Sequence, residues 1–169
     1  HYENMSIALA ESVANQGQGF INSMAFGNGG TSVDPTGIIT YLTPNSTGTN
    51  ASLYNQTYTK VVDDRSVTNL DPQRNKIETR HVNGTNYTDV LVTCLLDYGE
   101  PNGQDAVDQA SQANSLYVFD ELGLVSYSPS GTGKLLTHVV FHPVQKSLNR
   151  LVQIDYTVRV QSLTGFNEG

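Results

Sequence analysis

The sequence is poor in charged residues, in cysteine and in tryptophan, and each shortage argues against some kinds of structure or function. Only 15% of its 169 residues are charged, its single cysteine is Cys94, and tryptophan is absent. One cysteine cannot form a disulfide within the chain, so a packed core has to hold the fold. The length is enough for one domain of ordinary size. Low charge also suits a surface that neighbouring subunits cover.

Basic residues are scarce as well. Nine Lys and Arg against sixteen Asp and Glu give a formal net charge of −7, and the basic residues are scattered along the chain. Proteins that bind nucleic acid usually carry a basic patch or stripe, so we expect no direct contact with nucleic acid. Anionic membrane surfaces would repel such a chain. No apolar run is long enough to cross a bilayer and no signal peptide is evident, so we expect no membrane insertion.

Thr, Ser, Tyr and Asn are frequent, and they fall in short β-rich runs separated by Gly, Pro and Asn turns. These runs are Ile21–Phe26, Gly37–Leu42, Leu53–Val62, Lys76–Val82, Tyr87–Leu96, Leu116–Val125, Leu135–Phe141 and Leu151–Gln161. Asn83-Gly84 predicts the tight turn of a hairpin. Many short strands with frequent turns predict a mostly β fold, namely an antiparallel β-sandwich with long loops.

The last run gives the clearest signal, because apolar and polar residues alternate in it without a break. A period of two predicts a strand with one face in the core. The residues expected on that face are Val152, Ile154, Tyr156, Val158 and Val160.

The first twenty residues differ from the rest. His1–Gln18 is rich in Ala and ends at glycines, but its apolar residues are only loosely spaced. This pattern predicts a short N-terminal helix or an extended arm that docks on a partner. We therefore expect an arm or helix in residues 1–20 and a single β-sandwich domain in residues 21–169. A second short helix is expected at Asp105–Ala113.

Several residues suggest chemistry, but none forms a complete site. Gly131-Thr132-Gly133-Lys134 lacks the first glycine and the final Ser or Thr of a phosphate-binding loop, and it leads into a strand. His138 and His142 would lie about 13 Å apart on one face of a strand, at roughly 3.3 Å per residue, which is too far for one metal ion. Two polar cross-strand or interface residues is the better interpretation.

Acidic residues come together at Asp63-Asp64, Asp97–Glu100 and Asp120-Glu121, and we interpret all three as solvated loop charges or turn caps. Cys94 lies in an apolar run and is expected to be a small buried hydrophobe. A Gly-x-Ser-x-Gly nucleophile motif is missing from the sequence. We assign no catalytic, cofactor-binding or metal-binding residue and expect no cofactor.

Two sets of motifs resemble the N-terminal, particle-attaching domains of phage tail-fibre and tail-collar proteins. The first is Ile21–Gly30, an apolar strand ending in Gly-Asn-Gly-Gly, followed by Ala51–Gln56. The second comprises Phe119–Leu124, Gly133–Leu136, Val139–Lys146 and Val152–Val160. Their order and spacing match along most of the chain. Gln56 stands where those proteins often have Glu, and residues 99–114 look like an insertion peculiar to this chain.

The resemblance implies a non-enzymatic structural subunit of a tailed phage particle, placed in the tail, baseplate, collar or fibre attachment. It would work by assembly with other phage structural proteins and as a homo-oligomer, a ring or a trimer. The implied location is the virion, and the host cytoplasm during assembly. The candidate subunit interface is Met5, Ile7, Leu9, Val13, Phe26, Gly27, Asn28, Gly29 and Gly30.

Other functions stay open at this point. The chain could be a carbohydrate- or receptor-binding β-sandwich that uses its nine Tyr residues and Asn-rich loops, although the absence of Trp weakens that hypothesis. It could be a decoration protein of the phage head surface. The third alternative is an enzyme such as a polysaccharide hydrolase, which needs two carboxylates facing one cleft.

Overall fold

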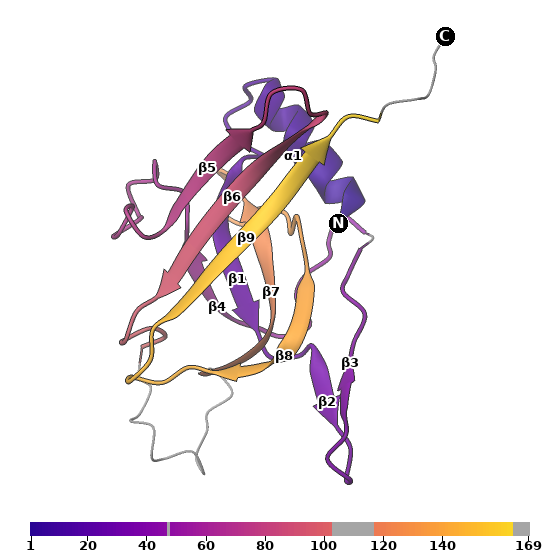
Figure 1. The fold of residues 1–169 in the computed structure, drawn as a ribbon, viewed down its shortest axis with the longest axis vertical. Coiled ribbons are helices and arrows are strands. Elements are labelled where there is room, and N and C mark those ends of the chain that lie inside the picture. The colour runs from indigo at the N-terminus through magenta and orange to yellow at the C-terminus, as the bar shows by residue number, and fades with distance from the viewer. Residues whose placement is uncertain (47, 103–116, 164–169) are drawn as a thin grey trace.

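A computed structural model describes residues 1–46, 48–102 and 117–163, and within them the chain is mostly β (Figure 1). The helix expected at Asp105–Ala113 lies outside the described residues. The elements in chain order are α1 (Tyr2–Val13), β1 (Ile21–Gly27), β2 (Thr31–Val33), β3 (Ile39–Tyr41), β4 (Gln56–Val61), β5 (Lys76–His81), β6 (Tyr87–Leu96), β7 (Val118–Ser126), β8 (Val139–Gln145) and β9 (Val152–Gln161).

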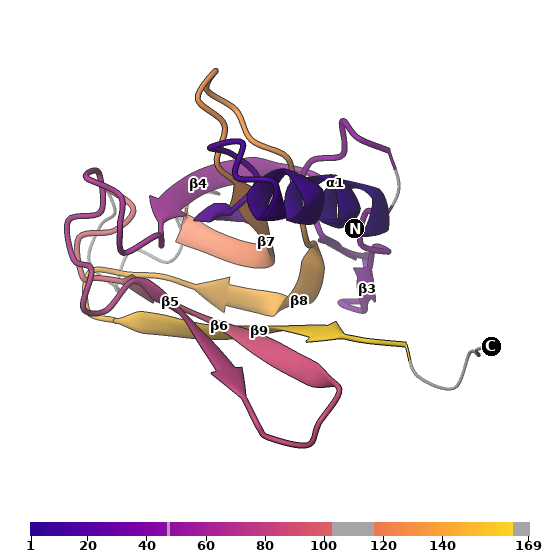
Figure 2. The same ribbon diagram turned by 90° about the horizontal axis from the view of Figure 1, so that it is seen from above.

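The strands form two layers and one separate hairpin. One sheet has the order β4-β1-β7-β8, the other has the order β5-β6-β9, and β2 pairs with β3 alone. All pairings are antiparallel. Figure 2, seen from above, shows the two sheets as stacked layers. The mostly β, antiparallel fold with a short N-terminal helix that the sequence predicts is confirmed.

The core lies between the two layers. Strands β1 and β7 contribute buried Met24, Phe26, Phe119, Leu122 and Leu124, and β6 contributes Val92, Cys94 and Leu96. Helix α1 lies across one end of the sandwich (Figure 1), where Ala8 is buried and Met5 packs against the core. The N-terminal segment is therefore a helix packed on the domain, held also by the Asn4 side chain, which donates to the carbonyl of Leu135 at 2.8 Å.

Strand β9 pairs with β6 over ten consecutive residues, from Leu96↔Val152 to Tyr87↔Gln161, with no shift of register. The alternation expected from the sequence is present: Val152, Ile154, Tyr156 and Val158 pack against the core cluster. Val160, on the same face near the end of the strand, is 46% exposed.

Cys94 is completely buried in β6, which confirms that it is a small core residue. Burial raises the pKa of its thiol to about 12, against an ordinary value of 9.0. Because the thiolate is the reactive form, we expect the folded protein at pH 8 to resist a thiol reagent such as Ellman's reagent. The same protein unfolded in guanidinium should react with one equivalent within minutes. Complete labelling of the folded protein at that rate would contradict the burial of Cys94.

Candidate functional site

Two consecutive carboxylates are buried in the middle of β7. Asp120 is 3% exposed and Glu121 is fully buried. The register of β7 against β8 shifts between Phe119 and Glu121, and this bulge accompanies the two acidic residues. The interpretation of this pair as solvated loop charges is therefore wrong. A buried carboxylate needs hydrogen-bond donors, and here the backbone of distant loops supplies them.

Glu121 accepts four hydrogen bonds. Its Oε2 accepts from the backbone N–H groups of Gly29 (2.9 Å) and Asn55 (2.8 Å), and its Oε1 accepts from the N–H of Tyr54 (2.8 Å) and from Nε2 of His138 (2.8 Å). Burial by itself raises the pKa of Glu121. The hydrogen bonds from His138 and the three N–H groups outweigh that effect, so the pKa lies below its ordinary value.

The ring of His138 has a defined orientation. Its Nδ1 accepts a hydrogen bond from the N–H of Asn45 at 2.8 Å, so the ring proton sits on Nε2, which donates to Glu121. His138 thus joins the loop that contains Asn45 to β7. His142, four residues on, is exposed and lies beside the hydroxyl of Tyr41 at 3.2 Å. The two histidines therefore contact different segments.

Asp120 binds the start of β2. Its Oδ1 accepts from the N–H of Gly30 at 2.9 Å, and its Oδ2 accepts from the N–H and the hydroxyl of Thr31 at 2.9 and 2.6 Å. The glycines of this segment allow the close approach: a Cβ on Gly29 would lie 2.7 Å from Cβ of Tyr54. We call Gly27–Gly30, together with Asp120, Glu121 and His138, the joint, because these residues connect the loops to β7 inside the protein.

The joint is inaccessible to a substrate. The side chains of Glu121 and His138 have no exposed surface. A general acid or base must be within reach of the substrate group to which it gives a proton or from which it takes one. Their hydrogen bonds all go to backbone groups or to each other. These hydrogen bonds attach the loops that contain Gly29, Asn45 and Tyr54-Asn55 to β7, and Glu121 and His138 have a structural role there.

The joint supports the β2–β3 hairpin, which extends away from the sandwich (Figure 1). Thr31 pairs with Tyr41 and Val33 pairs with Ile39. At the tip, Oδ1 of Asp34 accepts from the N–H groups of Thr36 and Ile38, both at 2.9 Å. Gly37 has a φ of +88°, which favours glycine. The hydrogen bond from the Thr36 side chain is the main reason that the pKa of Asp34 lies below its ordinary value.

The hairpin and the residue after it carry partly exposed apolar side chains. We call Val33, Ile38, Tyr41 and Leu42 the hairpin surface; they are 62%, 62%, 50% and 39% exposed. Exposed apolar side chains on a projecting hairpin are typical of a contact surface. Ile38, Tyr41 and Leu42 lie in the β-rich run Gly37–Leu42 that the sequence predicts.

The residues predicted from the sequence as an interface fall into two groups. On α1, at the end of the molecule away from the hairpin tip, Leu9 (49%) and Val13 (79%) are exposed, whereas Met5 and Ile7 are partly buried. Phe26 is 1% exposed and belongs to the core, and Gly27 and Gly30 are buried in the joint. Asn28 and Gly29 are partly buried.

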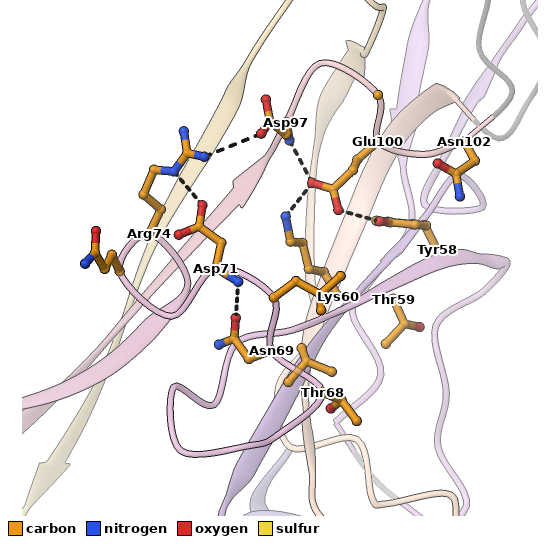
Figure 3. Close-up of a pocket in the computed structure, with 14 residues that line it drawn as sticks. Tyr58, Thr59, Lys60, Thr68, Asn69, Asp71, Arg74, Asp97, Glu100 and Asn102 are labelled. Atoms are coloured by element: carbon orange, nitrogen blue, oxygen red, sulfur yellow. Dashed lines mark hydrogen bonds and ion pairs between the residues drawn. The ribbon is translucent and has the colours of Figure 1, made fainter.

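A polar pocket of about 940 Å³ lies between β4 and the loops at 68–74 and 97–102 (Figure 3). Lys60 pairs with Glu100, which also accepts from the hydroxyl of Tyr58 at 3.2 Å. Arg74 pairs with Asp71 at 2.5 Å and with Asp97 at 3.5 Å. Burial raises the pKa of Glu100, but the hydrogen bond from Lys60 and its other partners hold that pKa below its ordinary value. The charges of this polar pocket therefore largely neutralise one another.

Residues 1–46, 48–102 and 117–163 contain no group of three or more His, Cys, Asp or Glu side chains that could hold a metal ion. No helix within this part of the chain is long and apolar enough to cross a membrane.

Comparison of the chain with models of protein families, with curated proteins and with solved structures finds no match.

Proposed function

We propose that the chain is a non-enzymatic structural subunit of a tailed phage particle and that the hairpin surface is a main contact with another structural protein. The resemblance of its motifs to tail-fibre and tail-collar attachment domains supports the particle. The observation that carries the contact is the hairpin itself, which exposes Val33, Ile38, Tyr41 and Leu42 and is held to β7 by the hydrogen bonds of Asp120.

Removing apolar surface from water is worth about 25 cal/mol per Å², so covering the exposed parts of Val33, Ile38, Tyr41 and Leu42 favours association. Asp120 and the Asp34 turn already hold the hairpin in shape, so little conformational entropy is lost on docking. An assembly subunit gains from such a contact because symmetry repeats it.

The proposal is tested with the double variant Val33→Ser/Ile38→Ser in the phage that encodes the chain. Both side chains are 62% exposed, so the fold should be unchanged by circular dichroism. Incorporation into purified particles, measured by quantitative mass spectrometry, should fall at least tenfold. The control is Val67→Ser, since Val67 is 98% exposed on a separate loop, and its incorporation should equal that of the wild type.

Two results would overturn the proposal. Normal incorporation of the double variant removes the hairpin surface as a contact. Purified particles that lack the chain altogether, shown by antibody labelling in electron microscopy and by mass spectrometry, remove the virion as its location.

Carbohydrate or receptor binding is the second candidate, and the polar pocket favours it. The pocket is open, polar and large enough for a sugar unit, and it presents Asn69 and Arg74 from one loop and Asn102 from another. A glycan array probed with the full chain is the direct measurement. Binding to a defined glycan that Arg74→Ala abolishes would favour this function over assembly.

A further inference from the structure

We propose that two copies of this chain associate through β9, edge to edge and antiparallel about a two-fold axis at Thr157. The two β5-β6-β9 sheets then form one continuous six-stranded sheet. This inference goes beyond the proposed function and does not depend on it, because it rests on the β9 edge alone. The occupant of that edge is a second copy of the chain.

Strand β9 offers an open backbone edge. Among the described residues, β6 is the only strand beside it (Figure 1). Ser162 donates its N–H to the carbonyl of Asn86 at 2.8 Å, in the same register as the β6–β9 pairs. Hydrogen-bonded pairs recur every second residue in an antiparallel ladder, so the even-numbered residues of β9 bond to β6. The odd-numbered residues, from 153 to 161, direct their N–H and C=O groups to the open edge.

The other three edges of the two layers are shorter or partly blocked. Strand β8 contains Pro143, which has no N–H to donate. On β5 the N–H of Ile77 is already bound by the side chain of Asp64 at 3.1 Å. Strand β4 spans only Gln56–Val61. Strand β9 is ten residues long, has no Pro or Gly and keeps one register throughout, so it lacks the short length, proline and bulge that protect many edges.

The charges of β9 are complementary to themselves in one register. When Thr157 lies opposite Thr157 of the second copy, Asp155 lies opposite Arg159 and Arg159 lies opposite Asp155. Gln153 and Gln161 face each other at the two ends. All of these residues are odd-numbered, so they form hydrogen-bonded pairs across the axis. Shifting the register by two residues in either direction separates the opposite charges, and centring it on residue 155 or 159 places like charges together.

Arg159 is already held in position for this contact. Its Nε and Nη2 bind Asp89 at 2.8 and 3.2 Å, and its guanidinium carbon lies 3.8 Å from the centre of the Tyr87 ring. A guanidinium group has five N–H donors, so Nη1 remains for a second carboxylate. Asp155 is exposed and touches only the amide of Gln153 within the described part of the chain, at 3.2 and 3.3 Å. It therefore remains available to Arg159 of the second copy.

An apolar groove adds a second, independent complementarity. A groove of about 310 Å³ lies at the open side of the sandwich between β8 and β9 and is lined by Phe141, Val144, Val152 and Ile154, among others. In the proposed register Val160 of the second copy lies opposite Ile154, on the core-facing side of the sheet. Val160 is 46% exposed in the single chain, and the dimer places it at this groove.

A cysteine scan of β9 in the full chain tests the register. Paired residues on a hydrogen-bonded site have Cα atoms about 5.5 Å apart, which suits a disulfide. Thr157→Cys should therefore form a cross-linked dimer on mild oxidation. Gln153→Cys is the matched control: its two copies would be roughly 26 Å apart at about 3.3 Å per residue, so it should not cross-link. Mixing Gln153→Cys with Gln161→Cys should give a cross-linked mixed dimer.

Charge variants test the affinity by analytical ultracentrifugation. Asp155→Lys places a cation opposite Arg159 and should weaken the dimer at least tenfold. Gln153→Lys adds the same cation opposite a neutral Gln161 and should change the dissociation constant less than threefold. Thr157→Pro removes an edge N–H that β6 does not use, so it should give a folded monomer.

The outcomes are decisive in either direction. A dimer at micromolar concentration, cross-linked by Thr157→Cys and weakened by Asp155→Lys, supports the proposal. A chain that stays monomeric at hundreds of micromolar, a trimer or ring as the smallest assembly, or equal cross-linking of Thr157→Cys and Gln153→Cys overturns it. Failure here leaves the hairpin surface untouched, because that contact is measured by particle incorporation.

Discussion

Replacing Glu121 with Gln should be strongly destabilising at neutral pH. The carboxylate accepts hydrogen bonds from three backbone N–H groups and from His138, and an amide would turn an NH₂ group toward donors. Breaking a buried charged network commonly costs about 3–5 kcal/mol. We expect a loss of about 3 kcal/mol or more in the free energy of unfolding, measured in urea. Glu78→Gln, with its side chain 54% exposed on β5, is the control and should change stability by less than about 0.5 kcal/mol.

The effect of Glu121→Gln should depend on pH in a defined direction. The pKa of Glu121 in the folded chain lies below its ordinary value of 4.5. The folded state therefore holds the ionised form more tightly than the unfolded state does, and this stabilisation is complete above pH 4.5. As the pH falls below 4.5 the wild type loses it, and the stability gap to the variant should narrow. A gap that stays constant down to pH 3, or one below about 0.5 kcal/mol at pH 7, would contradict the role given to Glu121.

Replacing Gly123 with Ala should also destabilise the fold, through steric overlap. A Cβ at this position would lie 2.2 Å from the backbone oxygen of Thr137 and 2.7 Å from Cδ1 of Leu135. The segment 135–137 cannot move freely, because Leu136 donates to the carbonyl of Leu124 at 2.7 Å. We expect a loss of about 2–4 kcal/mol, at or above the upper end of the usual cost of overpacking.

The control for Gly123→Ala is Gly99→Ala. Gly99 has open space around a Cβ and no left-handed backbone, so the added methyl group meets nothing. Thermal unfolding followed by circular dichroism compares the two variants directly. If both variants unfold within a degree of the wild type, β7 does not approach residues 135–137 as closely as the structure shows.

Strand periodicity predicts the bounds of β6 and β9 well, because each of these strands has one face in the core. The run Tyr87–Leu96 coincides with β6 at both ends, and Leu151–Gln161 differs from β9 by one residue. The hairpin predicted from Asn83-Gly84 joins β5 to β6, with a φ of +88° at Gly84. These features depend on local pattern, which a single sequence contains.

Other features depend on partners far along the chain, and local pattern misses them. Strand β2 has only three residues after the Gly-Asn-Gly-Gly turn, too few to show a period. Strand β8 begins at Val139 and continues through Pro143, because an edge strand tolerates a residue without an N–H. The burial of Glu121 could not be foreseen, since its donors at Gly29 and Asn55 lie far from it in sequence.

The order of the strands also sets when the chain can fold during synthesis. β1 pairs with β4 and β7, and its register with β7 joins Ile21 to Ser126, roughly 100 residues later, a separation that slows folding. The second sheet lacks β9 until Gln161 has been made. The β5–β6 hairpin can form early on the ribosome, whereas both layers of the sandwich close only after most of the sequence has emerged. Until then the apolar faces of β1 and β6 stay open to water, and a nascent-chain chaperone is best placed to cover them during that interval.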